Sequence, residues 1–303
     1  MKIIKQIYKS KIKKNFLNLI DENLKKDSHL IKSSNLWGKN LHKKNDNIPE
    51  GFEKKFNYGD GVDTHIEKVI QEFDLEIKYG NFLEIGCGPG IDLRYVIKNF
   101  KFSNIFAVDI GESIYDLSLL KKFSNIFFCR CDCSYLPFTD NSFDLIYSFG
   151  VFHHTKSFKI SILEARRVLK KNGILIFYNY KKHINFFKRF AIFIEKILLK
   201  MFRKLSFNQL KFICYIISPF ILLLFSYPAQ FLKILGSKKI YKSFPLWWGR
   251  TPFNIIGDLT DRLGAPKNER FSKKEMYEIL EINQFKNIEI KEVRDGLFCK
   301  VSK

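Results

Sequence analysis

The chain has 303 residues, 46% of them hydrophobic, which is enough for one large domain or for a domain with an insertion. Its 52 Lys and Arg residues outnumber 31 Asp and Glu residues, and the net charge of +21 predicts attraction to anions such as nucleic acid or an anionic membrane surface. The six Cys residues include no Cys-x-x-Cys pair, so the sequence predicts neither a metal site nor a disulfide framework.

The N-terminal segment Met1–Leu24 scatters isoleucines and aromatic residues among many lysines. This basic amphipathic pattern predicts a helix, and it lacks the continuous apolar core of a secretion signal. Two interpretations stay open, a helix that caps the sheet and a helix that lies on a membrane. The polar segment Ser33–Asp63, with Trp37 and Phe52 as anchors, is expected to form part of the mouth of a ligand site.

The segment Asn81–Gly90, NFLEIGCGPG, is an apolar run that leads into a Gly-x-Gly-x-Gly turn. A buried parallel strand gives such a run, and glycines at the following turn let the backbone approach a ligand that a Cβ atom would exclude. The dinucleotide fingerprint needs another glycine where this chain has Ile91. Glu84 precedes the turn, where a carboxylate favours a cationic or amine-bearing ligand over a pyrophosphate.

Four further apolar runs predict strands, with one helical stretch, Ile162–Leu169, before the last of them. The runs are Asn104–Asp109, Asn125–Asp132, Phe143–Phe149 and Ile174–Tyr180. The alternation of strand and helix predicts an α/β fold with a parallel sheet. Asp109 ends the second strand, where a carboxylate accepts hydrogen bonds from both hydroxyls of a ribose.

The chain resembles the class I S-adenosylmethionine-dependent methyltransferases of the broad small-molecule type (methyltransferase type 11) in four motifs that stand in the right order and spacing. They are LEIGCGPG, VDIGES, CDCSYLPFTDNSFDLIYSFGVFHHT and EARRVLKKNGILIFY, within about Phe82 to Tyr180. The resemblance implies a Rossmann-like sheet, mostly parallel with an antiparallel last strand, and S-adenosylmethionine as the cofactor.

The resemblance also implies which residues contact the methionine part of the cofactor. Gly86, Cys87, Gly88 and Gly90 would wrap the methionine moiety and the ribose. Glu84 would lie near the methionine amine, and Phe149 would lie beside the methionine part.

On the adenosine side, the resemblance implies that Asp109 holds the ribose hydroxyls and that Ile110 packs on the adenine face. Asp132 and the backbone of Cys133 would reach the amino edge of the adenine. Taken alone, Glu84 or Asp109 would also suit a helix cap, but together with the glycines they predict a ligand site.

Several side chains in this region have chemistry of their own. His153 and His154 follow the fourth strand, and either could deprotonate an acceptor hydroxyl, with His154 favoured; lining of the cofactor pocket is the alternative. Cys129, Cys131 and Cys133 alternate along one strand and therefore point to one face, like any apolar residues.

The segment Lys181–Lys242 is inserted after the fifth strand. Its first part mixes apolar residues with Lys and Arg at helical spacing. Its second part, Phe212–Leu232, has no charged residue and is long enough to span a bilayer. A single span would separate strands of one sheet, and Pro219 and Pro228 are expected to divide the segment into shorter helices. A buried lid over the active site and a lid in a membrane interface both stay open.

The C-terminal part predicts a helix at Ser272–Phe285 and a hairpin of Asn287–Val293 with Leu297–Val301, which by the resemblance completes the sheet. Before it, Trp247 and Trp248 beside Arg250 would either hold an acceptor or plug the lid onto the core, and the plug is favoured. The expected domains are an N-terminal basic helix and acceptor-side cap (1–64), a cofactor-binding core (65–180), a helical insertion (181–250) and a C-terminal helix and hairpin (251–303).

The function expected from these features is methyl transfer from S-adenosylmethionine to a small-molecule, lipid-linked or glycan-linked acceptor. A nucleic-acid methyltransferase is disfavoured because Ser148–His153 stands where base-modifying relatives carry an Asn-Pro-Pro-Tyr type motif. A membrane-attached protein that keeps the fold without turnover is the third hypothesis. The expected location is the cytoplasm, with peripheral attachment to an anionic membrane surface.

Overall fold

The computed structural model describes residues 3–12, 15–20, 31, 35, 64–77, 80–115, 117, 124–183, 185–202, 205–237, 240–247, 249, 252–264, 268–293 and 296–303. The chain divides into two compact units, which we call the sheet unit (Met1–Lys181 with Glu269–Lys303) and the helical unit (Lys182–Asn268). The predicted mouth at Ser33–Asp63 lies outside the described residues except for Asn35.

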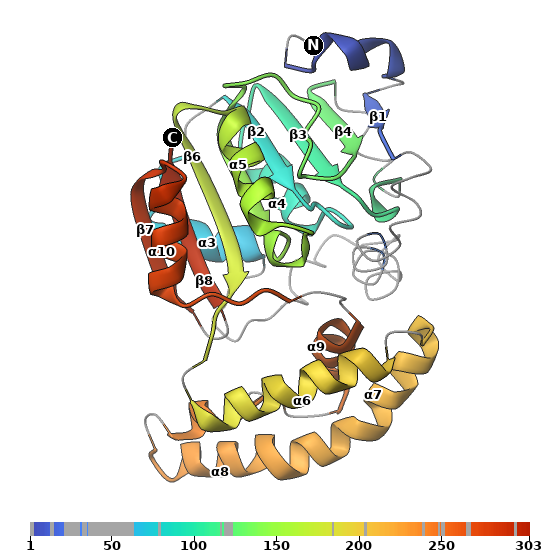
Figure 1. Ribbon diagram of the computed structural model, residues 1–303, viewed down its shortest axis with the longest axis vertical. Coiled ribbons are helices and arrows are strands. Elements are labelled where there is room, and N and C mark those ends of the chain that lie inside the picture. Colours follow the sequence, from blue (N-terminus) through green and yellow to red (C-terminus); the bar gives the residue numbers. More distant parts are fainter. Residues whose placement is uncertain are drawn as a thin grey trace. The chain divides into compact units, whose positions relative to one another are not determined.

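The sheet unit is built on one eight-stranded sheet, in the order β1-β4-β3-β2-β5-β6-β8-β7 (Figure 1). The strands are β1 (Phe16–Asn18), β2 (Asn81–Ile85), β3 (Asn104–Asp109), β4 (Ile126–Arg130), β5 (Phe143–Phe149), β6 (Leu169–Tyr180), β7 (Lys286–Glu292) and β8 (Gly296–Ser302). Neighbouring strands from β1 to β6 are parallel, whereas β8 runs antiparallel to β6 and to β7. The predicted Rossmann-like sheet with an antiparallel last strand is confirmed.

Helices cover both faces of this sheet. Apolar side chains of α3 (His65–Phe73) and α4 (Ile91–Asn99) form one core layer with the sheet. Those of α5 (Phe158–Val168) and α10 (Lys273–Ile282), on the nearer side in Figure 1, form the other. Because side chains alternate along a strand, a run of consecutive apolar residues in a central strand supplies both layers.

The C-terminal prediction of a helix and a hairpin is confirmed. Helix α10 begins at a capping box, in which Glu275 N donates to Ser272 Oγ (3.2 Å) and Ser272 N donates to Glu275 Oε2 (2.8 Å). The fifth predicted strand starts earlier than expected: β6 includes the predicted turn at 171–173, where Asn172 has a φ of 66° and the pairing with β5 shifts register.

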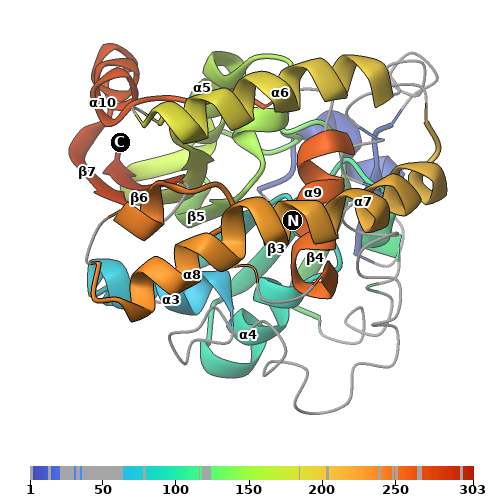
Figure 2. The ribbon, with the colours of Figure 1, turned by 90° about the horizontal axis from the view of Figure 1, so that it is seen from below.

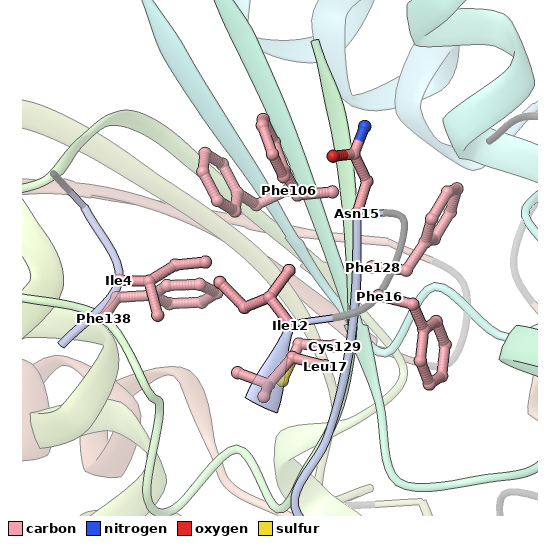
Figure 3. Close-up of a pocket in the computed structure, with 10 residues that line it drawn as sticks. Ile4, Ile12, Asn15, Phe16, Leu17, Phe106, Phe128, Cys129 and Phe138 are labelled. Carbon is pink, nitrogen blue, oxygen red and sulfur yellow. The ribbon is translucent and has the colours of Figure 1, made fainter. Parts of the chain in front are cut away.

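The described residues of the N-terminal segment, 3–12 and 15–20, do not form the predicted amphipathic helix. A short 3-10 helix, η1 (Gln6–Lys11), is followed by β1, which pairs in parallel with β4. Ile4 and Leu17 are buried against Phe138 and the sheet, and Figure 3 shows these side chains around a cavity of about 10 Å³. The scattered apolar residues therefore fill one edge of the core, and a tertiary contact overrides the local pattern.

The helical unit contains α6 (Phe186–Phe202), α7 (Phe207–Ile221), the π-helix η7 (Leu222–Ser226), α8 (Tyr227–Ile234), the 3-10 helix η8 (Ile240–Ser243) and α9 (Pro252–Gly264). Its core is small and lies where α9 packs against α7. The buried residues that form this cluster are Leu210, Cys214, Leu222, Ile255, Ile256, Leu259 and Leu263. The insertion thus ends at Asn268 rather than at residue 250, because α9 shares this core.

The prolines do not divide the apolar segment, contrary to the sequence-based expectation. Helix α7 runs through Pro219 and continues through η7 into α8 (Figure 2), so that 208–234 form 27 helical residues. Proline removes the donor for the carbonyl of Tyr215, and the Ser218 hydroxyl donates to that oxygen instead (3.0 Å). The π-turn, in which Tyr227 N donates to Leu222 O, precedes Pro228.

Leu17 tests the docking of β1. Its side chain is 2% exposed, so Leu17→Ala should lower the free energy of unfolding by about 2–5 kcal/mol, through lost burial and the cavity left behind. Leu163→Ala is the matched control, because Leu163 is 39% exposed and its truncation should change stability by less than about 0.5 kcal/mol. Equal effects in urea denaturation would contradict the packing of β1.

Candidate cofactor site

The glycine turn after β2 is tied to the neighbouring strand. Gly86 N and Cys87 N both donate to Val108 O, at 2.7 and 3.1 Å. Gly86 has a φ of +79°, and a Cβ atom there would overlap Val151 Cγ2. Gly88 also has a positive φ, and apart from its chain neighbours no atom of the described residues lies within 4 Å of the place of a Cβ, so these residues leave open space on that side.

Asp109 joins this turn to the next one. Its Oδ2 accepts from Gly88 N (2.8 Å) and its Oδ1 accepts from Gly111 N (2.6 Å). The side chain is buried. Asp109 therefore stands where the sequence predicts it, at the carboxyl end of β3, and its orientation is fixed by the two turns.

Glu84 has an unsatisfied oxygen at this edge of the sheet. Its side chain is buried, and among the described residues Oε2 has no hydrogen-bond partner. Burial, followed by the negative charges of Asp92 and Asp109, raises the pKa of Glu84 well above its ordinary value. A buried carboxylate without a partner is costly, and a cationic ligand group placed against it would remove that cost.

Asp92 lies near Glu84 but has many partners. Its Oδ1 accepts from His65 N (3.0 Å) and Ile66 N (3.2 Å), and its Oδ2 accepts from Tyr147 Oη (2.8 Å). Burial alone would raise the pKa of Asp92, but the hydrogen bonds from His65 and Tyr147 and the charge of His65 lower it. The sequence analysis did not find this group, because only the fold brings the first turns of α3 and α4 together.

The remaining predicted cofactor residues gather at the same edge. Asp132 follows β4, where its Oδ1 accepts from Ser134 N (2.8 Å), and the neighbouring Cys133 is buried. The backbone oxygen of Ile110 accepts from Arg130 Nε (3.1 Å). Phe149 ends β5, with its ring stacked on Tyr178 (4.4 Å between centroids) and 3.8 Å from the ring of His65.

The two histidines after β5 differ in exposure. His153 is completely buried, its ring lies 4.1 Å from that of Tyr180, and neither ring nitrogen has a partner among the described residues. Burial, and then the charges of His154 and Arg270, lower the pKa of His153 well below its ordinary value, so it is neutral near pH 7. His154 is 9% exposed and is the only one of the pair with surface through which to meet a ligand.

Residues 83–177 match the family described as "Methyltransferase domain". This part of the chain is a methyltransferase domain. The match spans the glycine turn, Asp109, Asp132 and both histidines. No group of three or more His, Cys, Asp or Glu suited to a metal ion occurs among the residues that the structure describes.

Among the relatives of this methyltransferase domain, sterol 24-C-methyltransferase ERG6B of Gibberella zeae is 29% identical over 136 residues, which are 42% of this chain and 35% of that protein. Malonyl-[acyl-carrier protein] O-methyltransferase 2 of Coxiella burnetii is 28% identical over 138 residues, 43% of this chain and 55% of that protein. The chain thus matches about a third to a half of these relatives' lengths. A solved methyltransferase from Aquifex aeolicus, described as SAM-dependent, is 19% identical, covers 86% of this chain and 96% of its own, and has a TM-score of 0.45.

The family implies S-adenosylmethionine as the cofactor, and the residues of the methyltransferase domain fit it. S-adenosylmethionine carries an amine and a ribose, which are the groups that Glu84 and Asp109 suit. In the sequence, Gly88, which has open space beside it, stands between Glu84 and Asp109.

Glu84 predicts a pH dependence of cofactor binding. Only the ionised carboxylate pairs with the amine. The affinity for S-adenosylmethionine should therefore rise as the pH increases from 4.5, the ordinary pKa of Glu, to the raised pKa of Glu84, by up to about tenfold per pH unit. Over the same window the free protein should lose stability, because its folded state holds the proton more tightly than the unfolded chain.

Calorimetric titration of Glu84→Gln with S-adenosylmethionine tests this. The variant should bind about tenfold or more weakly at pH 7 and without the pH slope. Glu278→Gln, an exposed position on α10, is the control and should behave like the wild type. A slope that survives in Glu84→Gln would contradict the assignment.

Proposed function

We propose that the protein transfers the methyl group of S-adenosylmethionine to a small-molecule or lipid-linked acceptor. The observation that carries the proposal is the buried Glu84 carboxylate, whose Oε2 lacks a described partner, beside the glycine turn and Asp109. A ligand amine would relieve its desolvation cost, and Asp109, a carboxylate at the carboxyl end of β3, would accept hydrogen bonds from the ribose of the same ligand. Both groups belong to one cofactor.

The chain's own residues would bind the cofactor, orient the acceptor and exclude water. S-adenosylmethionine supplies a methyl group already activated on a sulfonium, so aligning the acceptor is worth up to roughly 7–11 kcal/mol of the barrier. Glu84 would hold the amine of the cofactor and Asp109 its ribose, and the stacked ring of Phe149 forms an apolar wall. A base is needed only for a hydroxyl or an acidic carbon, and His154 is the residue proposed to accept that proton.

The acceptor is proposed to have an apolar part. Two relatives are named for methylation of a sterol and of a malonyl group on an acyl-carrier protein, which supports acceptors of this kind. Nucleic acid is less well supported, since the segment after β5 lacks the motif of base-modifying enzymes. The proposed location is the cytoplasm, at the periphery of a membrane, and six free, buried Cys residues suit a reducing compartment.

Asp109→Asn tests the function. The change keeps the shape of the side chain but puts an amide donor opposite a backbone N–H, so affinity for S-adenosylmethionine should fall by about 10–100-fold. Transfer of labelled methyl from S-adenosylmethionine into a metabolite and lipid extract should fall with it. Asp140→Asn, at a residue whose side chain is 66% exposed, should retain both.

Mass spectrometry of the extract then identifies the acceptor as the molecule that gains one methyl group. No cofactor binding by the wild type would defeat the proposal. Binding with no methylated product in any extract would favour the non-catalytic alternative.

A further inference from the structure

The long helix formed by α7, η7 and α8 has its large apolar side chains on the outside. The side chains that point inward recur every three to four residues and are mostly small: Leu210, Cys214, Ser218, Leu222, Ser226 and Ala229. A second set at the same spacing is exposed by 46–65% and is mostly large; we call it the outer stripe: Phe212, Ile216, Phe220, Leu223, Tyr227 and Phe231. A helix that faces water has the opposite arrangement.

The inward side of this helix is satisfied as it stands. Ser218 Oγ donates to Tyr215 O (3.0 Å) and Ser226 Oγ donates to Leu246 O (2.7 Å). Leu210, Cys214 and Leu222 pack in the core that α9 completes. Rotating the helix to bury the outer stripe would break the bond from Ser226 to Leu246 and open this core, so the exposure of the large residues is built into the fold of the unit.

Helix α6 adds a second apolar stripe with basic flanks. None of its residues is buried, and Phe186, Phe190 and Phe193 are 74%, 53% and 58% exposed. Exposed Arg189, Lys196 and Lys200 lie along the same helix. Aromatic residues with flanking Lys and Arg are typical of helices that lie in a membrane interface.

The distribution over the whole molecule supports one kind of partner. Of the 24 large apolar side chains that are exposed in the described chain, 18 belong to the helical unit. This unit carries fifteen Lys and Arg against three Asp and Glu. Exposed apolar surface combined with strong positive charge complements an anionic lipid surface, in which phosphate head groups border hydrocarbon.

We propose that the helical unit is a monotopic membrane anchor, which lays the outer stripe and the phenylalanines of α6 into the interface of an anionic bilayer. The inference rests on the proposed function only in that a lipid-linked acceptor gives such binding a purpose. Membrane binding itself is measured without acceptor or turnover.

A transmembrane arrangement conflicts with the ends of the unit. Residues 208–234 form one helix long and apolar enough to cross a membrane, although 28% of its most apolar window is buried. Both ends of the insertion belong to one sheet unit, where Lys181 bridges to Phe271 and Phe271 N donates to Tyr180 O (3.1 Å). A single crossing would place these bonded residues on opposite sides of the bilayer.

The neighbours of the helix also disfavour insertion across the bilayer. Arg262 of α9 lies 3.9 Å from Glu195 of α6, and their side chains are only 17% and 11% exposed. Because α9 packs along α7, a spanning α7 would carry this charged pair into the hydrocarbon, where charged side chains are costly. Lying in the interface avoids that cost.

Sedimentation of the full-length protein with lipid vesicles tests the anchor. Binding should be stronger to vesicles with about one third phosphatidylglycerol than to pure phosphatidylcholine, and salt should weaken the difference. Alkaline carbonate should release the protein. Lys196→Glu with Lys200→Glu should reduce binding to the anionic vesicles and leave binding to neutral ones nearly unchanged.

Phe220→Asp with Phe231→Asp tests the outer stripe directly. These side chains are 62% and 61% exposed, so the fold tolerates the change, while vesicle binding should fall by about tenfold or more. Ile282→Asp, a matched apolar-to-acidic change at a 74% exposed site in the sheet unit, should bind as the wild type does. All variants should keep their affinity for S-adenosylmethionine, which separates this proposal from the cofactor assignment.

Four outcomes would overturn the anchor. They are no binding to either vesicle, resistance to carbonate as for a spanning helix, dimerisation of the wild type that the Phe220 and Phe231 changes abolish, and loss of cofactor affinity in those variants, which would identify the stripe as a lid.

Discussion

The site depends on one carboxylate that bonds two loops at once. Asp109 accepts from Gly88 N and Gly111 N, and so fixes the turn after β2 against the turn after β3. This is possible because parallel strands end at the same edge of the sheet, which places both turns within reach of one side chain. Glu84 precedes the glycine turn and has no described partner for Oε2, and the proposed pairing with a ligand amine rests on that isolation.

The order of the strands explains how so large an insertion is accommodated. Strand β8 lies between β6 and β7 and pairs with the C-terminal half of β6. The bridge from Lys181 to Phe271 then closes the insertion at its base. Because the entropy of closing a loop grows only slowly with its length, the sheet is little affected by the 87 residues of the helical unit. The two units therefore have separate cores.

The sequence predicted those parts in which local pattern and tertiary packing agree. Apolar runs marked β2 to β6, Ser272 marked the start of α10, and each predicted cofactor residue lies at a strand end on one edge. The sequence-based predictions failed where a residue distant in the sequence determines the local structure. Asp92 is held by His65 and Tyr147, which no spacing rule connects, and the N-terminal residues follow the pairing of β1 with β4 rather than their amphipathic pattern.

At Pro219 the sequence-based prediction of a helix break failed because of a neighbouring residue. The helix continues because the Ser218 hydroxyl supplies the hydrogen bond that proline lacks. The continuity matters for the outer stripe. From Phe212 to Phe231 its residues recur at intervals of four, four, three, four and four, close to the 3.6 residues of a helical turn. Such a stripe stays on one side of the rod instead of winding around it. A band of large apolar side chains on one side of the rod, in a unit that carries fifteen Lys and Arg, suits a lipid surface whose anionic head groups border hydrocarbon.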